Sequence, residues 1–343
     1  MTRHSITLGS VVLALTLGGA CGANRNATAH TVKVADAAPP TGRLLLAEFT
    51  HGIGAVSAGT PTPVWLDANA VAAADGSSVF SIHLDGAGGN DSLVRLDPAT
   101  GAVRSSWPLA DRGLSVSAVA PNGQWIAMTN RRTGYGDQHR STTTLVVFDT
   151  QLGKDTRRLE LKGDVQPEAF STDGAQVFAL DYRGDHYRVQ TIALDTQQRY
   201  DTSDRDKRLP PEDMHGQPVH GVMGADRTLL ATLYRNPGNA KEPAFVHVLD
   251  LVHAYSYCAD LPAPFGTGAP GTDAIELTSA DTVVVAATEA ARLAEIRIED
   301  VHQLPDKPVR VSFRSGTISL PDAAFRSMAG FEFVIAPVAA AAP

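Results

Sequence analysis

The chain has 343 residues, of which 43% are hydrophobic, and carries 29 lysines and arginines against 37 aspartates and glutamates, a formal net charge of −8. An acidic chain without a basic run or a basic-aromatic cluster lacks the electrostatic footprint of a nucleic-acid-binding protein, so we expect no nucleic-acid partner. The length allows a sizeable core, and beyond the first twenty residues no apolar segment is long enough to span a bilayer.

Residues 1–20 have the features of a secretory signal peptide. A positively charged start precedes an apolar stretch from Ile6 to Leu17, which is short for a membrane span, and small residues follow it. Cys21 comes next, and the sequence LGGAC resembles the bacterial lipobox, in which the cysteine thiol is acylated and becomes the new N-terminus. The lipobox pattern prefers leucine where this chain has Gly18, so cleavage without lipidation is the alternative.

The segment 21–42 lacks apolar periodicity and is rich in alanine, threonine and proline, which is typical of a disordered tether. We therefore expect a protein anchored to the cell membrane through a palmitate-type lipid and facing the extracytoplasmic side; without acylation it is secreted. If Cys21 is acylated, Cys258 is the only remaining thiol and no intrachain disulfide can form. We expect Cys258 to be a small buried residue.

Beyond the tether, one pattern repeats five times along the chain. Each segment reads as an apolar strand, a tight turn, a second strand, a variable loop, and a third strand followed by a short fourth strand. Asp-Gly and Asn-Gly form hairpin turns because both residues tolerate positive φ. The turn residues recur 47 to 55 positions apart, at Asp75, Asn122, Asp173, Asp226 and Asp281.

A second feature recurs in step with the turns, because each third strand ends at an aspartate. Two features that keep the same order five times indicate a structural repeat of roughly fifty residues, the length and content of a β-propeller blade. The aspartates are Asp97, Asp149, Asp195, Asp250 and Asp300.

The stretches FSTDGAQVFALD and VAPNGQWIAMTN resemble the repeats of TolB-like, YVTN and WD40-like β-propellers. The resemblance covers residues 43–337 and implies the architecture rather than the chemistry; the fourth and fifth repeats lack the turn glycine. We predict an all-β fold, a six-bladed propeller of four-stranded antiparallel blades, closed by strands in 43–67 together with FEFVIAPV near the C-terminus. A seventh blade is the alternative if 314–337 holds further strands. Residues 338–343 are predicted to be a disordered tail.

In propellers of this resemblance, the loop between the second and third strands opens on the same face as the connections between blades. Asp85, Arg132, Arg183 and Arg235 follow the turn residues by ten, ten, ten and nine positions. Arginine can clamp a carboxylate or a phosphate, and tyrosine is common at interfaces, whereas the alternative is solvated arginines paired with Asp137 and Asp185. The candidate binding residues are Arg132, Tyr135, Arg183, His186, Tyr187 and Arg235.

Catalytic and metal-binding motifs find little support. Asp185-His186 and the histidines at 215 and 220 match no metal-ligand spacing, and adjacent residues rarely direct both side chains to one point. The nearest serine motif lacks its first glycine, and three tryptophans do not fit a Trp-rich quinoprotein propeller. We expect no catalytic residue, no metal and no cofactor, in a chain that acts as a monomer.

The sequence therefore predicts a non-catalytic binding or scaffolding module in the bacterial cell envelope. Its partner, a protein or a small-molecule ligand, would bind on the loop-rich face of the propeller. The alternative is a hydrolase or lactonase acting on a small molecule in the central channel. A TolB-like part in envelope assembly is a third possibility, implied by the fold resemblance alone.

Overall fold

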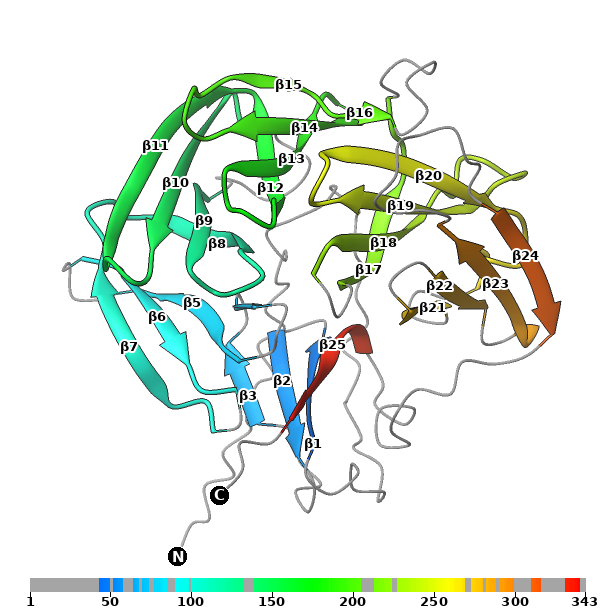
Figure 1. Ribbon diagram of the computed structural model, residues 1–343, viewed down its shortest axis with the longest axis horizontal. Coiled ribbons are helices and arrows are strands. Elements are labelled where there is room, and N and C mark those ends of the chain that lie inside the picture. The colour runs from blue at the N-terminus through cyan, green and yellow to red at the C-terminus, as the bar shows by residue number, and fades with distance from the viewer. Residues whose placement is uncertain are drawn as a thin grey trace, which may run out of the picture.

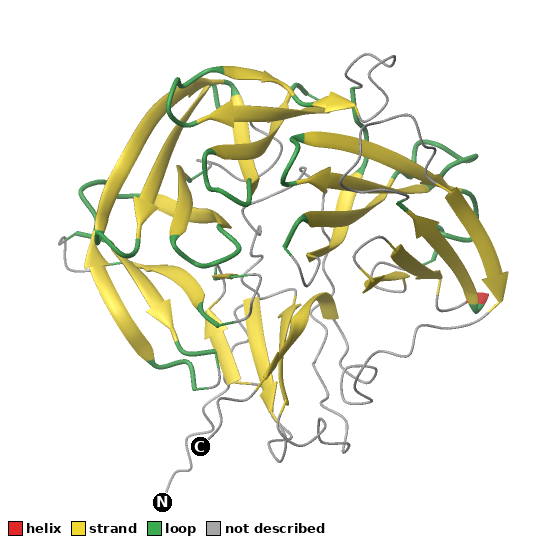
Figure 2. Cartoon of the chain, viewed as in Figure 1, coloured by secondary structure: helices red, strands yellow, loops and turns green. Residues whose placement is uncertain are grey.

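The computed structural model is all-β, and it describes a chain built from strands joined by loops (Figure 2). Among the residues that the structure describes, no helix is long and apolar enough to cross a membrane. The described residues are 43–49, 52–57, 64–67, 70–73, 77–84, 90–98, 100–131, 139–184, 186–204, 213–223, 227–268, 273–279, 282–287, 290–298, 310–315 and 331–339.

The described strands form sheets A to F, which are antiparallel apart from one short parallel pair. Sheet A contains Arg43–Phe49 (β1), Gly52–Ser57 (β2), Val64–Asp67 (β3) and Phe331–Ala339 (β25). Sheet B contains Val71–Ala72 (β4), Val79–His83 (β5), Ser92–Leu96 (β6) and Val103–Pro108 (β7). Sheet C contains Leu114–Val119 (β8), Trp125–Asn130 (β9), Thr142–Asp149 (β10) and Lys154–Lys162 (β11).

The second half of the chain forms the other three sheets. Sheet D contains Asp164–Phe170 (β12), Gln176–Tyr182 (β13), Tyr187–Ala193 (β14) and Arg199–Asp201 (β15). Sheet E contains Ser203–Asp204 (β16), Gln217–Met223 (β17), Leu229–Arg235 (β18), Ala244–Asp250 (β19) and Tyr255–Leu261 (β20). Sheet F contains Asp273–Ser279 (β21), Thr282–Ala287 (β22), Arg292–Arg297 (β23) and Arg310–Ser315 (β24).

The sheets are arranged around a common centre (Figure 1). The first strands of the repeats, such as β8, β12 and β17, lie near the centre, and the last strands, such as β7, β11 and β24, lie on the outer rim. This radial arrangement of mostly four-stranded meanders is that of a β-propeller, so the predicted all-β propeller class is confirmed.

Sheet A joins the two ends of the described chain, because β25 pairs antiparallel with β1 from Arg43↔Ala339 to Phe49↔Phe331. β25 also lies beside β17 of sheet E. Its last two residues fall in the segment predicted as a C-terminal tail. The number of blades in a closed ring stays a prediction, and residues 316–330, where a seventh blade was considered, lie outside the described residues.

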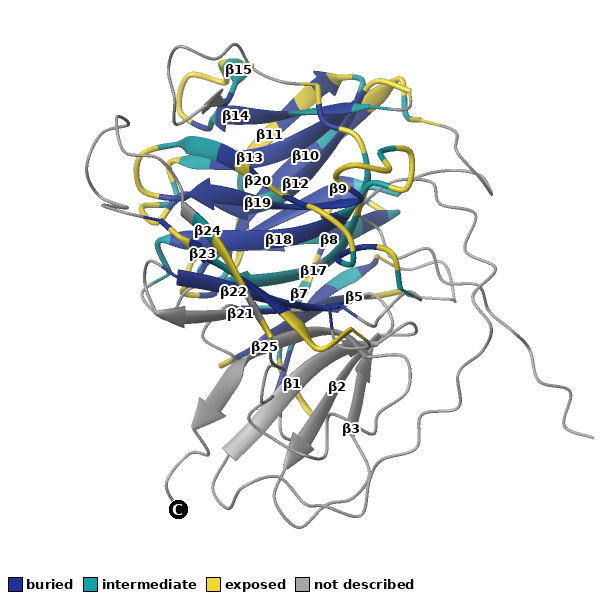
Figure 3. Cartoon of the chain, turned by 90° about the vertical axis from the view of Figure 1, so that its right-hand side faces the viewer, coloured by how far each residue is buried: buried dark blue, intermediate teal, exposed yellow. Residues whose placement is uncertain are grey.

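Burial explains why the second and third strands read as continuous apolar runs. Every residue of β19 and β22 is buried, because a middle strand is covered on both faces by neighbouring sheets. β20, the last strand of the repeat in sheet E, instead alternates, with Tyr257 and Ala259 buried and Cys258 exposed. The expectation that Cys258 is buried was therefore wrong. In Figure 3 the central strands are coloured as buried, and exposed residues lie at turns and rims.

The aspartates at the ends of β10 and β19 close the turn that follows each of these third strands. The carboxylate of Asp149 accepts hydrogen bonds from the backbone N–H groups of Gln151 and Leu152 at 2.8 and 3.0 Å. Asp250 does the same for Val252 and His253, at 2.9 Å each. The recurring residue is thus an Asx-type turn former, which is a structural role.

The turn between the first two strands needs positive φ. Gly123 and Gly174 have φ of 69° and 70°, and Arg227 takes the same region, at 62°, in the fourth repeat, which lacks the glycine. At Gly174 an added Cβ would also overlap the ring of Trp125 in sheet C.

Gly174→Ala should therefore destabilise the fold more than Gly113→Ala. Gly113 has a similar φ of 72° but open space around the position of a Cβ. We expect about 1–2 kcal/mol for the positive φ in both variants, and about 1 kcal/mol or more in addition at Gly174, because Trp125 must shift. Urea denaturation measures the difference, and equal losses would show that Trp125 moves at no cost.

Candidate functional site

The candidate residues from the sequence fall at the ends of second strands and the starts of third strands. Arg183 directly follows β13 and Arg235 is the last residue of β18, so the two hold corresponding positions in adjacent sheets. Tyr187 begins β14, and His186 precedes it. Cys21, Asp85, Arg132 and Tyr135 lie outside the described residues.

Arg183 is held by a carboxylate from its own sheet. Its Nε donates to Asp181 Oδ2 at 2.8 Å, and its Nη2 lies 2.8 Å from the same oxygen. The Asp181 side chain is 8% exposed, and its other oxygen, Oδ1, lies 2.7 Å from Nη2 of Arg199. One nearly buried carboxylate therefore fixes two guanidinium groups, while the Arg183 side chain stays 40% exposed.

The pairing continues along the edge of sheet D as an alternating series of charges, which we call the Arg–Asp ladder. Arg199 donates to Gln190, whose Nε2 donates to Asp201 Oδ1 at 2.8 Å. Arg188 bridges Asp201, at 2.8 Å, and Asp213. The ladder consists of Asp181, Arg183, Arg188, Gln190, Arg199, Asp201 and Asp213.

Two histidines lie beside the ladder. The rings of His186 and His215 have centroids 5.8 Å apart, and His215 is exposed. The hydrogen bond from Arg188 lowers the pKa of the Asp213 carboxyl, and the charges of His186 and Arg183 act in the same direction. Among the described residues, no three histidine, cysteine or acidic side chains are grouped to hold a metal ion.

Tyr187 lies beneath this surface. Its side chain is buried, with 1% of the residue exposed. Its backbone forms an isolated bridge to Met214, with N–H···O distances of 3.0 and 2.8 Å in the two directions. The structure thus places Tyr187 as a support that ties the start of β14 to the segment before β17.

Arg235 makes contacts of a different kind from Arg183. Its Nε and Nη2 donate to the carbonyl oxygen of Gly266 at 3.0 and 2.7 Å, and Nη2 also donates to Gly268. Its guanidinium therefore fastens the segment that follows β20. The two arginines share a position in the repeat, and their side chains serve different purposes.

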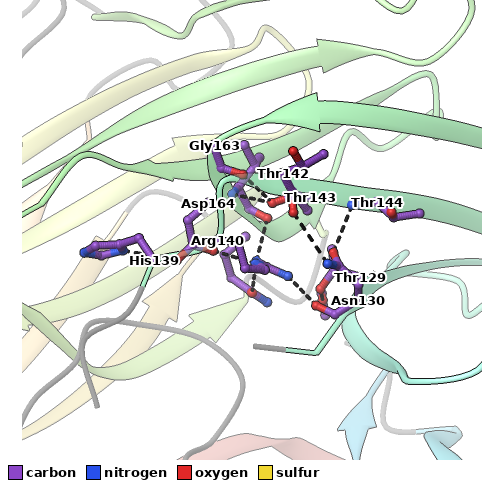
Figure 4. A network of polar contacts seen from close by, with 12 residues as sticks. Thr129, Asn130, His139, Arg140, Thr142, Thr143, Thr144, Gly163 and Asp164 are labelled. Carbon is purple, nitrogen blue, oxygen red and sulfur yellow. Dashed lines mark hydrogen bonds and ion pairs between the residues drawn. The ribbon is translucent and has the colours of Figure 1, made fainter. Parts of the chain in front are cut away.

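A buried polar network between sheets C and D was missed at the sequence level (Figure 4). The fully buried carboxylate of Asp164 accepts from Nε of Arg140 at 2.7 Å and lies 3.1 Å from Nδ1 of His139. Nε2 of His139 lies 3.0 Å from the carbonyl oxygen of Gly184, in the loop that carries Arg183. The network therefore links the loop ends of both sheets. The sequence signal for this network is Asp164, a charged residue at the start of the mostly buried strand β12.

Arg140 is enclosed within the same network. Its side chain is 6% exposed, and its remaining donors reach the carbonyl oxygens of Asn130 and Val165 at 2.5 and 3.0 Å. Thr143 Oγ1 accepts from the N–H of Val165 at 2.9 Å and donates to the carbonyl oxygen of Gly163 at 2.8 Å. These bonds fix how β12 enters the centre of the propeller.

The radial arrangement of mostly four-stranded antiparallel meanders defines the chain as a β-propeller repeat protein. No family model and no curated protein sequence matches it. Solved structures that it resembles include TolB from Acinetobacter baumannii, with 12% identity and a TM-score of 0.42 over 87% of this chain and 66% of that chain. A putative TolB from Agrobacterium tumefaciens has 14% identity and a TM-score of 0.42, covering 82% of this chain and 90% of that chain.

The Cps50 (Swd1) β-propeller domain of Myceliophteria thermophila is similar at 12% identity, with a TM-score of 0.42 over 82% of this chain and 74% of that domain. The chain spans about two thirds of the Acinetobacter TolB chain. The propeller class of this chain rests on its own strand order and pairing.

Proposed function

We propose that the chain is a non-catalytic binding or scaffolding module of the cell envelope, built as a six-bladed propeller. Sheets B to F each follow one repeat of the sequence, and sheet A combines β1–β3 with β25. The β1–β25 pairing supports closure of the ring by the two ends of the chain, since a closed ring leaves no sheet face uncovered.

The observation that carries the proposal is the setting of Arg183. Its guanidinium is partly exposed, yet the Asp181 carboxylate that holds it is nearly buried and is itself fixed by Arg199. A side chain already ordered before binding loses less conformational entropy when a partner arrives. Arg183 is therefore a pre-ordered cation on a rigid sheet end, suited to a carboxylate on a protein partner.

The rest of the ladder sets the character of the surface. Arg188, Asp201 and Asp213 place both signs of charge beside Arg183, and the exposed His215 borders them. A mixed surface of this kind selects a partner by charge complementarity rather than by bulk attraction. We propose a protein partner with complementary acidic and basic side chains.

Affinity capture of envelope proteins with the full chain tests this role. Arg183→Ala should weaken retention of the specific partner about tenfold or more, as expected for an interface hot spot. Arg158→Ala is the matched control, because Arg158 is a half-exposed arginine on the outer strand β11. A partner retained equally by both variants would contradict the proposed face.

Membrane anchoring is a separate part of the proposal. The sequence before Arg43 supports lipidation at Cys21 followed by a tether over 21–42. Labelled palmitate should enter the wild-type chain and be absent from Cys21→Ser. Label that persists in the variant would exclude this anchor and leave the secreted form.

A further inference from the structure

The contact between sheets D and E, which we call the D–E seam, contains several buried tyrosine rings. Its core includes Tyr182, Tyr187, Tyr234 and Phe245. Their rings follow one another across the seam, with centroid separations of 5.6, 5.8 and 4.9 Å. The seam lies directly beneath the loop ends that carry Arg183 and His215.

A carboxyl group enters this seam from β12, the innermost strand of sheet D. The pairing of β12 with β13 shifts register between Pro167 and Ala169, which leaves Glu168 as the extra residue of a bulge. The hydroxyl of Tyr234, on β18 of sheet E, donates to Glu168 Oε1 at 3.0 Å. The second oxygen, Oε2, is buried without a hydrogen-bond partner among the described residues.

Among the residues that the structure describes, the groups around Glu168 do not neutralise a negative charge. The titratable side chain that contacts it across the seam is Tyr234 of β18, whose ring packs against Tyr187 of β14, and His247 of β19 lies edge-on to Tyr234 with ring centroids 6.2 Å apart. Burial raises the pKa of Glu168 from 4.5 to about 7, and the hydrogen bond from Tyr234 lowers it in part. Burial alone likewise lowers the pKa of His247 to about 3. Neither Tyr234 nor His247 therefore supplies a positive charge near neutral pH.

We propose that Glu168 is a proton-dependent latch between sheets D and E. Protonated, it is a neutral group that the seam accommodates and that Tyr234 ties to sheet E. Ionised, it places an uncompensated charge in an apolar contact, which favours opening of the seam. The Tyr187–Met214 bridge crosses the same contact, so opening also releases the loop ends above it. The latch does not depend on whether that surface binds a partner.

The direction in which pH changes the stability depends on the pKa of Glu168 in the unfolded and in the folded chain. In the unfolded chain Glu168 ionises near pH 4.5, whereas in the folded chain it keeps its proton up to about pH 7. Relative to a variant that cannot ionise at position 168, the wild type therefore loses stability as the pH rises from 4.5 to about 7, and the loss is complete above pH 7.

Glu168→Gln is the direct test, since glutamine has the shape of the neutral acid and cannot ionise. Relative to the wild type, the folding equilibrium constant of this variant should rise about 150-fold between pH 4.5 and pH 8, because the carboxyl pKa is 4.5 in the unfolded chain and about 7 in the folded chain. Urea unfolding across pH 4.5–8.5 measures this ratio. Glu160→Gln is the control, because Glu160 lies exposed on β11, and its ratio to the wild type should stay constant.

A second variant separates the latch from a general effect of burial. Tyr234→Phe removes the hydrogen bond that favours the ionised carboxyl, so the pH at which the latch titrates should move upward. Hydrogen exchange of the Tyr187 and Met214 amides, corrected for the intrinsic rate, should show weaker protection at pH 8.5 than at pH 5 in the wild type and equal protection in Glu168→Gln. Parallel pH profiles for the wild type and Glu168→Gln, or a downward shift in Tyr234→Phe, would overturn the proposal.

Discussion

Acidification from pH 7 to pH 3 is expected to reduce the free energy of unfolding by about 4 kcal/mol through His247 alone. His247 lies in the middle of β19 with 1% of its surface exposed, and burial lowers its pKa from 6.5 to about 3. The unfolded chain takes up this proton below pH 6.5 and the folded chain does not. The stability contribution is therefore complete above pH 6.5 and is lost progressively as the pH falls toward 3.

In the wild type, the titration of Glu168 offsets the pH dependence of stability that His247 causes. Between pH 4.5 and pH 6.5 the folded chain holds one proton on Glu168 and none on His247, whereas the unfolded chain holds one on His247 and none on Glu168. The two states bind equal numbers of protons at this pair of residues, so the two slopes cancel. We expect a flat contribution from the pair in this range.

Glu168→Gln should therefore expose the titration of His247. In this background the free energy of unfolding should fall by about 1.4 kcal/mol per pH unit below pH 6.5, and His247→Leu should abolish that slope. Denaturant midpoints at pH 5, 6 and 7 measure it. His215→Gln replaces an exposed histidine and should leave the slope unchanged. A slope that survives His247→Leu would assign the acid sensitivity to another group.

Asp164→Asn is expected to cost about 3–5 kcal/mol, because it leaves the charge of Arg140 buried without its counter-ion. The Asp164 side chain is 0% exposed and that of Arg140 is 6% exposed, so water cannot replace the lost interaction. The carbonyl oxygens around Arg140 still accept hydrogen bonds, but they carry no full charge. Urea unfolding at pH 7 measures the loss.

Two comparisons make this second prediction specific. Asp111→Asn breaks the Arg158 pair, which lies at 50% and 33% side-chain exposure, and should cost under about 1 kcal/mol. Combining Asp164→Asn with Arg140→Met removes the stranded charge and should cost less than the sum of the two single variants. Additive losses would show that the two side chains act independently.

The repeat was predictable because its causes are local. Asp173-Gly174 forms a turn through the positive φ of glycine, and Asp149 closes the next turn through the backbone N–H groups beside it in sequence. The prediction for Cys258 failed because its exposure depends on which side of β20 it lies, and in this strand near the outer rim buried and exposed residues alternate.

The candidate site was only partly predictable, since spacing gives a position and not a contact. Counting from the turns places Arg183 and Arg235 at the ends of second strands. It cannot show that Arg183 shares Asp181 with Arg199, or that Arg235 is directed to the carbonyl oxygen of Gly266.

The sequence by itself determined the all-β repeat, its turns and the order of its strands, because these depend on interactions within about fifty residues. Only the tertiary structure decided which polar groups meet between sheets. Asp164 and His139 are 25 residues apart, and Glu168 and Tyr234 are 66 residues apart. Such pairs form when neighbouring sheets pack face to face in one register, and a bulge at a single residue turns a carboxyl group into the seam.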